Sequence, residues 1–263
     1  MSELSVLAIS AVFQEHPDYR PVPVSAASAS SADNEGVAQL ARAVAEFTGV
    51  PAERLRMLAD ADVQAATQVG GRALAALGAP AEEQPLFLVR SGPLLDPYSA
   101  ELARLVHESG WAGEDVGITH LDELGGTAVF GLLNWALPEQ AEATVLVCDD
   151  PLFVDELDGR APIGVVGLRV LHGPGPLRVL GCGEGVPEPG LLGEADHRFL
   201  GTRPCDGWRA LHAMLAAGRI DDGDRILLHT RGPRREGWLA LEAVDVAAPR
   251  LTDAGFIELA TEY

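Results

Sequence analysis

The sequence predicts an α/β protein in which helices pack on a largely parallel sheet. Predicted strands and helices alternate along most of its 263 residues, which is typical of such sheets. The most informative stretch is 116–136, where a short strand rich in β-branched residues turns directly into an apolar helix. A Gly/Pro-rich turn at 172–176 separates two further apolar runs and predicts that they pair as an antiparallel hairpin.

Seven elements are predicted before residue 110. They are a buried strand at 4–12, a loop at 25–31, a helix at 35–47, a connector at 50–58, a helix from residue 60 or 62 to 77, a core strand at 85–89 and a helix at 99–108. The helices are indicated by apolar residues that recur every three or four positions. Gly78 and Gly110 follow the last two helices, as glycine commonly does where a helix ends.

The central helix, at 125–136, follows the strand at 116–119 and the turn at 120–124. Its apolar body, with Val129, Phe130, Leu132, Leu133 and Trp135, leaves little polar surface. A helix that is apolar on nearly all sides is typically buried. Its N-terminus presents free backbone N–H groups and a partial positive charge to the carboxylates of the turn.

The remaining elements are predicted from short β-branched runs and turn residues. They are strands at 143–148, 163–171 and 177–180, a loop at 181–193, a helix at 208–217, and strands at 225–229 and 238–246.

Composition and charge exclude several classes of function. The net charge is −20, which argues against a nucleic-acid partner because phosphate binding needs a basic face. All 19 basic residues are arginines, so Schiff-base chemistry and a Walker-type phosphate site have no lysine to use. Neither a secretory leader nor an apolar run long enough to span a membrane is recognisable, so we expect a cytoplasmic protein.

The three cysteines predict neither a disulfide framework nor a metal site. Cys148, Cys182 and Cys205 are scattered, without the paired spacing that zinc sites show. Cys148 ends an apolar strand and is expected in the core. Cys205 precedes a helix, where a thiolate could be stabilised, but a buried, inert thiol is the favoured interpretation.

The run Gly125-Gly126-Thr127-Ala128, followed by Asn134-Trp135, resembles the active-site segment of the thiolase-superfamily condensing enzymes. The similarity is greatest to 3-hydroxy-3-methylglutaryl-CoA synthase and 3-oxoacyl-[acyl-carrier-protein] synthase III. In the former, the nucleophilic cysteine precedes an aromatic residue and Gly-Gly-Thr-Ala, and the helix ends in Asn-Trp. Glu123 stands where the resemblance places that cysteine.

A second segment, 217–244, is similar to the C-terminal end of synthase III enzymes, with a helix, a Gly-Arg-Ile run, a Gly-Asp turn and two final strands. Together the similar segments cover roughly two thirds of the chain. The resemblance implies a layered α-β-α-β-α fold made of two similar halves. It divides this chain into an N-terminal half at 1–180 and a reduced C-terminal half at 181–263.

The resemblance also implies that the family's other catalytic residues are lost. Only 181–200 stands where the family carries the block with its catalytic histidine, and His197 there lies in a different context. Gly201-Thr202-Arg203 replaces the family's Gly-Asn-Thr turn. The chain thus resembles a shortened member without the catalytic cysteine, histidine and asparagine.

Glu123 is the central candidate for a catalytic residue. A carboxylate cannot hold an acyl chain as a thioester, but it can act as a general base or acid. Alternatively, it caps the helix and fills the vacated site. His120 and His229, each at the end of a predicted strand, are candidates to assist it or are merely hydrogen-bonded. The candidate substrate-binding residues are Gly125, Gly126, Thr127, Arg231 and Arg234.

Two charged clusters have alternative interpretations. Arg231, Arg234 and Arg235 either receive a pantetheine phosphate or carrier protein, or form an exposed hairpin tip. The acidic run that starts at Asp149 and Asp150 is expected to be a solvated loop, because its spacing fits no calcium-binding loop.

The resemblance suggests two functions. A third alternative is an unrelated α/β domain that resembles the family by chance. The first is a non-condensing partner subunit of fatty-acid or polyketide-type biosynthesis that shapes or supports an acyl-thioester site. The family pairs through the strand before the nucleophile, here 116–119, which predicts a homodimer or a heterodimer with a full-length ketosynthase. The second is an acyltransferase-like enzyme that uses Glu123 for decarboxylation, hydrolysis, cyclisation or acyl transfer. No metal or cofactor is expected. The substrate would be a CoA or phosphopantetheine thioester. An acyl-carrier protein is a further candidate partner.

Overall fold

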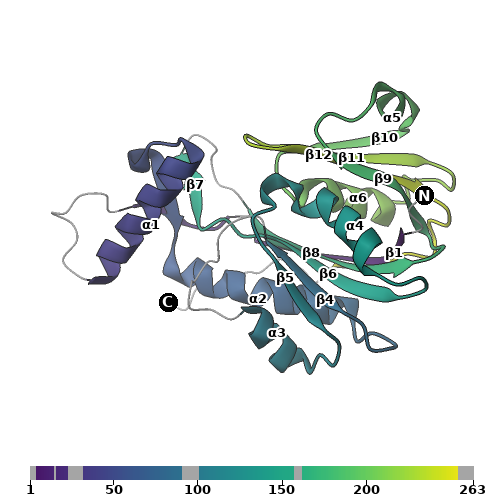
Figure 1. Ribbon diagram of the computed structural model, residues 1–263, viewed down its shortest axis with the longest axis horizontal. Coiled ribbons are helices and arrows are strands. Elements are labelled where there is room, and N and C mark those ends of the chain that lie inside the picture. The colour runs from purple at the N-terminus through teal and green to yellow at the C-terminus, as the bar shows by residue number, and fades with distance from the viewer. Residues whose placement is uncertain (1–3, 15, 23–31, 91–100, 157–161, 254–263) are drawn as a thin grey trace.

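The computed structural model describes residues 4–14, 16–22, 32–90, 101–156 and 162–253 (Figure 1). The strands are β1 (Leu4–Gln14), β2 (Tyr19–Pro21), β3 (Leu55–Leu58), β4 (Leu86–Arg90), β5 (Asp115–Ile118), β6 (Glu142–Asp149), β7 (Phe153–Asp155), β8 (Ile163–His172), β9 (Leu177–Glu184), β10 (His197–Gly201), β11 (Arg225–Arg231), β12 (Glu236–Ala243) and β13 (Arg250–Asp253). The helices are α1 (Ala32–Thr48), α2 (Asp60–Leu77), α3 (Glu101–Ser109), α4 (Gly125–Ala136), α5 (Pro189–Glu194) and α6 (Asp206–Ala216), with one-turn 3-10 helices η1 (Ala52–Arg54) and η2 (Asp122–Leu124).

One large sheet of ten strands carries the fold. Its order is β10-β11-β12-β9-β1-β8-β6-β4-β5, and β13 pairs with β1. The pairs β4–β5, β4–β6, β10–β11 and β1–β13 are parallel, whereas the other pairs are antiparallel. The sheet is therefore mixed, and the prediction of a largely parallel sheet is wrong.

Helices α4 and α6 lie between the two ends of this sheet, which curves around them (Figure 1). Their core joins residues of both ends, such as Val89 and Val147 on one side and Leu228 and Leu239 on the other, around the buried Trp208. Helices α2 and α3 pack on the opposite face of β4, β6 and β8 through a second apolar core. This alternation of helix and sheet layers confirms the predicted layered fold.

The face of β11 that is turned away from α6 is contacted by α5, which has only six residues. The predicted division at residues 180 and 181 falls inside β9 and stays a prediction.

The predicted hairpin between 163–171 and 177–180 is wrong. β1 lies between β8 and β9 and is antiparallel to both, so the two strands do not pair with each other. The turn at 172–176 passes the start of β1, where a Cβ atom at Gly175 would lie 2.7 Å from Ser5 Cβ. A segment more than a hundred residues away in sequence thus separates strands that the turn alone would have paired.

A small lobe beside the large sheet was not predicted. β2, β3 and β7 form a separate sheet, and α1 packs on it through Val22, Ala41 and Leu55. Its strands have three or four residues each, too few to show a periodicity in the sequence. Residues 55–58, predicted as part of a connector, are its central strand, while the predicted loop at 25–31 lies outside the described residues.

Helix α4 has the predicted bounds but not the predicted burial. Its inner side, with Val129, Phe130 and Leu133, is in the core, whereas Leu132 is 44% exposed and Trp135 is 86% exposed. The strand before it, β5, is found one residue earlier than predicted and lies at the edge of the sheet. Within the described ranges, none of the helices has the length and apolar character that crossing a membrane requires.

Candidate functional site

Glu123 lies in η2, at the carboxyl edge of the sheet, which is formed by the C-terminal ends of the parallel strands β4, β5 and β6. The turn that leads into η2 holds two non-glycine residues in left-handed backbone conformations, His120 with φ 63° and Asp122 with φ 50°. Such conformations are destabilising by about 1 kcal/mol or more and persist where the surroundings impose them. After this turn the Glu123 side chain is only 7% exposed, although it belongs to a residue type that is rarely buried.

The turn between β11 and β12 covers Glu123. A Cβ atom at Gly232 would lie 1.9 Å from Glu123 Cγ, so only glycine fits there. Arg234, from the same turn, places Nη2 3.0 Å from Asp122 Oδ1 and Nε 4.0 Å from Glu123 Oε1. The second carboxylate oxygen, Glu123 Oε2, is buried without a hydrogen-bond partner among the described residues. Arg234 is therefore the nearest counter-charge of a carboxylate that is only partly satisfied.

The two glycines after η2 let α4 touch the start of α6. A Cβ atom at Gly126 would lie 2.1 Å from the Pro204 carbonyl oxygen, and one at Gly125 would lie 3.4 Å from Pro204 Cβ. Trp208 Nε1 donates to the Gly126 carbonyl at 2.7 Å. The N-termini of the two central helices thus pack directly against each other, with backbone occupying the space between them.

Thr127 serves the helix start rather than an open site. Its Oγ1 donates to the Leu124 carbonyl at 3.3 Å, and the side chain is 2% exposed. A Cβ atom at Gly237 of β12 would lie 3.2 Å from this Oγ1 and 2.6 Å from Leu124 Cδ2. β12 therefore seals the same side of η2 that the turn at Gly232 covers.

The two candidate histidines have polar partners other than Glu123. His120 is exposed, and its Nδ1 lies 2.9 Å from Thr119 Oγ1. His229 lies in β11, and its Nε2 is 2.8 Å from Glu236 Oε1. Its neighbour Leu228 faces Gly207 of α6, so the alternation of a strand turns His229 to the opposite face of the sheet.

The arginine cluster is partly engaged by carboxylates. Arg234 pairs with Asp122, and Arg235 makes two hydrogen bonds to Glu184, at 3.0 and 2.9 Å. Arg231 is exposed at the end of β11. The structure thus brings together Glu123, Gly125, Gly126, Thr127 and Arg234, and places His120, His229 and Arg231 outside this group.

Two buried ion-pair groups at the same edge of the sheet were missed. Arg203 holds Asp149 through two hydrogen bonds, at 2.7 and 2.6 Å. Arg90, only 2% exposed, contacts both Glu101 and Asp150. The expectation that Asp149 and Asp150 are solvated is therefore wrong. The sequence did carry a signal, since both acids directly follow the apolar run of β6, where sheet proteins place functional groups.

Burial dominates the electrostatics of these carboxyl groups. It raises the pKa of Asp150 to about 7, because the loss of solvent outweighs the attraction of Arg90. Burial is also the largest cause of the raised pKa values of Glu101 and Asp149. Each of these carboxylates is paired with an arginine, Arg90 or Arg203.

The thiols are unsuited to nucleophilic chemistry. Cys148 and Cys205 are buried as predicted, and burial raises both pKa values well above the usual range. Cys205 Sγ donates to the Val147 carbonyl at 3.2 Å. Burial also raises the pKa of Cys182, which is half-buried. Across the described part of the chain, no three His, Cys, Asp or Glu side chains are placed to hold a metal ion.

Neither a protein-family model nor a curated protein sequence matches the chain. Solved structures do match it in fold. The protein ChlB3, described as an acyltransferase, has a TM-score of 0.61 at 14% identity, with 94% of this chain and 99% of that chain covered. 3-oxoacyl-(acyl carrier protein) synthase III, FabH, from Pseudomonas aeruginosa PAO1 has a TM-score of 0.53 at 14% identity, with 92% and 99% covered.

PksG, a 3-hydroxy-3-methylglutaryl-CoA synthase from Bacillus subtilis, has a TM-score of 0.57 at 13% identity, with 93% of this chain and 80% of that chain covered. The resemblance to condensing enzymes of the thiolase superfamily is thus confirmed at the level of the fold. At this identity the likeness does not extend to activity.

Proposed function

We propose that this protein is a non-condensing partner subunit of fatty-acid or polyketide-type biosynthesis, which supports an acyl-thioester site on a full-length ketosynthase homologue. The observation that carries the proposal is the buried carboxylate of Glu123, which Gly232 covers. The sequence resemblance assigns this position to the nucleophilic cysteine of the condensing enzymes. Condensation starts with transfer of an acyl group to a thiolate, and a carboxylate cannot form a thioester.

The two fully buried thiols are poor candidates for a nucleophile. Burial keeps Cys148 and Cys205 protonated at neutral pH, and a protonated thiol is a poor nucleophile. Protein atoms pack closely on and around Glu123, because Gly232 lies directly on its side chain, Gly126 packs on Pro204, and Gly237 packs on Leu124 and Thr127. These contacts support a scaffold in which the former site is filled.

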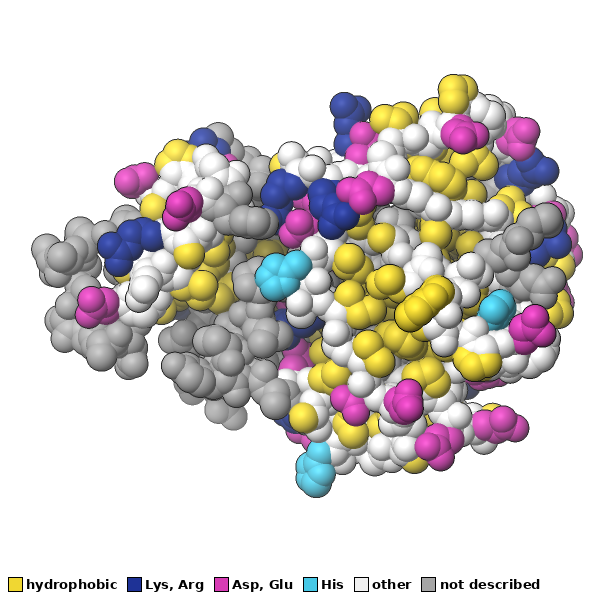
Figure 2. Space-filling model, in the orientation of Figure 1, with side chains coloured by type: hydrophobic (Ala, Val, Ile, Leu, Met, Phe, Trp, Pro, Cys, Tyr) yellow, Lys and Arg dark blue, Asp and Glu magenta, His cyan; other side chains and the backbone are white. Residues whose placement is uncertain are grey.

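A partner surface lies next to this filled site. β5 is an edge strand whose residues 115–117 are exposed, and an unpaired edge can add a strand from another chain. Val116 on β5 and Leu132 and Trp135 on α4 are exposed, and Figure 2 shows apolar side chains gathered over α4. A large apolar patch of this kind is typical of an interface. We therefore propose that β5 and the outer face of α4 pair with a ketosynthase homologue or with a second copy of this chain.

A second candidate function is an enzyme of altered chemistry that uses Glu123. One observation favours it: Glu123 Oε2 is buried and unpartnered among the described residues, and an unsatisfied buried acid often marks a functional group. A general base there would serve decarboxylation, hydrolysis, cyclisation or acyl transfer on a CoA or phosphopantetheine thioester. Exposed Arg231 is then the group that would meet a phosphate or a carrier protein. The cytoplasmic location stays a prediction.

Substitution of Glu123 separates the two functions. We would assay wild type and Glu123→Gln on acyl-CoA and acyl-carrier substrates, each alone and with a full-length ketosynthase, with exposed Glu139→Gln as the matched control. The partner function predicts no turnover by the isolated protein, and the same stimulation of the ketosynthase by all three proteins. Turnover by isolated wild type and Glu139→Gln that is lost in Glu123→Gln would instead establish the enzyme.

A further inference from the structure

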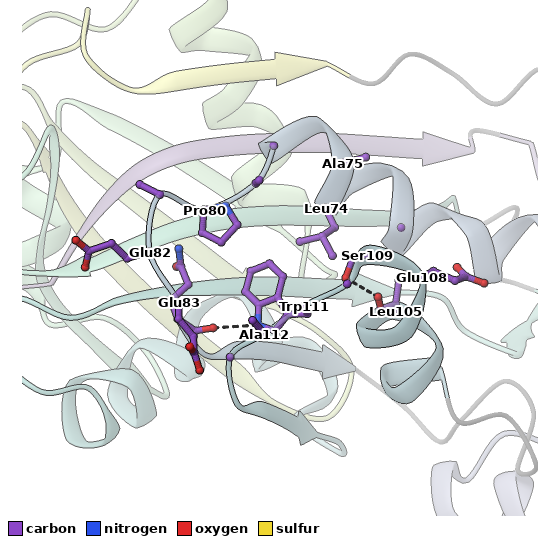
Figure 3. A pocket seen from close by; sticks show the side chains of 17 residues that line it. Leu74, Ala75, Pro80, Glu82, Glu83, Leu105, Glu108, Ser109, Trp111 and Ala112 are labelled. Carbon is purple, nitrogen blue, oxygen red and sulfur yellow. Dashed lines mark hydrogen bonds between the residues drawn. The ribbon is translucent and has the colours of Figure 1, made fainter.

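A pocket of about 630 Å³ opens between α2 and α3, at the edge of the sheet where β4 and β5 begin (Figure 3). It lies at the opposite edge from Glu123, and neither proposed function uses it. Its volume is in the range of about 300–1,000 Å³ that small-molecule sites occupy. Its walls come from the C-terminal turns of both helices and from the segments that lead into the two strands.

The inner wall is apolar and well fixed. Leu74 and Leu105 are buried, and Pro80 and Trp111 are half-buried beside them. Trp111 Nε1 donates to the Gln84 carbonyl at 2.9 Å, which holds the indole in place. A Cβ atom at Gly113 would lie 1.9 Å from the same oxygen, so the two segments touch. The pocket is therefore formed before any ligand arrives.

The charged side chains that line the pocket are all carboxylates: Glu82, Glu83 and Glu108. Figure 3 shows Glu82 and Glu83 on one side of Trp111 and Glu108 on the other. Glu108 pairs with Arg104 at 2.7 Å, whereas no cation among the described residues pairs with Glu82 or Glu83. The potential at that end is negative, and the net charge of −20 adds to it.

Two arginines lie behind the pocket wall. The Arg169 guanidinium is 5.7 Å from the centre of the Trp111 ring and donates to the Gly78 carbonyl and to Thr144 Oγ1. Arg250 Nη2 would lie 2.9 Å from a Cβ atom at Gly78. Neither arginine belongs to the pocket lining, so the charges that a ligand in the pocket meets first are those of the carboxylates.

We propose that this pocket binds a small organic cation, in which an ammonium group is carried on an apolar alkyl or aryl body. The body lies against Leu74, Pro80 and the Trp111 indole, where burial of apolar surface favours binding. The ammonium group lies at the end of the pocket that Glu82 and Glu83 line, where their carboxylates attract it. An anion of the same shape, such as a fatty acid, meets repulsion from the same carboxylates.

A matched pair of probes tests the proposal on the full chain. Isothermal titration with hexylammonium and with hexanoate compares one apolar body with two opposite charges. Hexylammonium should bind at a single site and at least about tenfold more tightly, a difference of about 1.4 kcal/mol. Equal affinity for the two probes, or no binding of hexylammonium at millimolar concentration, would overturn the proposal.

Two variants locate the binding. Glu82→Gln combined with Glu83→Gln changes only exposed side chains and should weaken hexylammonium binding at least fivefold, whereas Glu139→Gln combined with Glu188→Gln should not. Ala75→Phe, at an exposed α2 position that lines the pocket, should abolish binding of both probes and leave the free energy of unfolding unchanged. Unchanged affinity for hexylammonium in both pocket variants would contradict the site. The association of the same two variants with a ketosynthase is measured separately and tests the proposed function.

Discussion

The central sheet has a carboxyl edge, where β4, β5 and β6 end, and an amino edge, where β4 and β5 begin. The two edges differ in how much space the surrounding side chains leave for a ligand. At the carboxyl edge, the turn at Gly232 covers Glu123, the starts of α4 and α6 touch, and buried ion pairs take up the remaining charges. At the amino edge, α2 and α3 leave a pocket of about 630 Å³ with an apolar wall and an acidic rim. The closed edge is the one where α/β sheets ordinarily bind their ligands.

This difference is set by how closely backbone segments approach one another. Glycines at 126, 232 and 237 allow the backbone to come close to Pro204, Glu123 and Leu124. Helices α4 and α6 pack in the core through Phe130 and Trp208, whose ring centroids are 5.6 Å apart. The packing of the central helices and the covering of Glu123 thus occur at the same edge of the sheet.

The largest expected effect comes from breaking the buried ion pairs of the closed edge. Arg90→Met leaves Glu101 and Asp150 buried without their cation, and should lower the free energy of unfolding by about 3–5 kcal/mol near neutral pH. Urea unfolding monitored by circular dichroism measures it. Arg20→Met, which breaks a pair at the surface, should change stability by less than about 1 kcal/mol. Equal losses in the two variants would show that the buried group contributes nothing special.

Insertion of one methyl group tests the closure itself. Gly126→Ala places Cβ 2.1 Å from the Pro204 carbonyl, so α4 and α6 must separate, at a cost of about 1–3 kcal/mol. Gly36→Ala in α1 meets nothing within 4 Å and should be neutral or stabilising. The same urea titration compares them. A neutral Gly126→Ala would mean that the two helix starts do not pack as described.

The titration of Asp150 gives an effect that depends on pH. Because its pKa is raised from 3.8 to about 7, the folded protein keeps this proton after the unfolded chain has lost it. Its contribution to stability is fully present below about pH 4 and is lost as the pH rises through about 7. Asp150→Asn, which does not titrate, should therefore gain stability relative to wild type over that range. Unfolding free energies at a series of pH values measure this difference, and a constant difference would contradict the raised pKa.

The smallest effect on folding is expected on the outer face of α4. Trp135 is 86% exposed, so Trp135→Glu should change the free energy of unfolding by no more than about 0.5 kcal/mol. The same change places a charge in the proposed interface and should abolish association with a ketosynthase or a second copy. Light scattering after size-exclusion chromatography detects the loss of association. Leu200→Glu is the control, because Leu200 is likewise an exposed apolar residue. Association that survives Trp135→Glu would place the interface elsewhere.

Local patterns predicted the elements that depend on local interactions. The helix at 125–136 was predicted with its observed bounds, because two glycines after a turn and an apolar body mark it within one short stretch. Its exposed side was not predicted. An apolar residue such as Trp135 has the same appearance in a sequence whether it faces a core or a partner.

The failures concern contacts between distant segments. β1 inserts between β8 and β9, and no feature of the turn at 172–176 indicates that strand. Asp149 and Asp150 were interpreted as a solvated run because their partners, Arg203 and Arg90, are about fifty residues away or more. The covering of Glu123 by Gly232 depends on a turn from the other half of the sheet. Only the folded chain brings these groups together.

Intact-mass spectrometry after incubation with acyl-CoA tests the central claim most directly. A condensing enzyme of this fold would keep an acyl group on its nucleophile, and a full-length ketosynthase serves as the positive control. If Glu123 closes the former site, the wild-type protein should show no added mass and release no free CoA. An acyl adduct on any of its side chains, or CoA release that disappears in Glu123→Gln, would contradict the account.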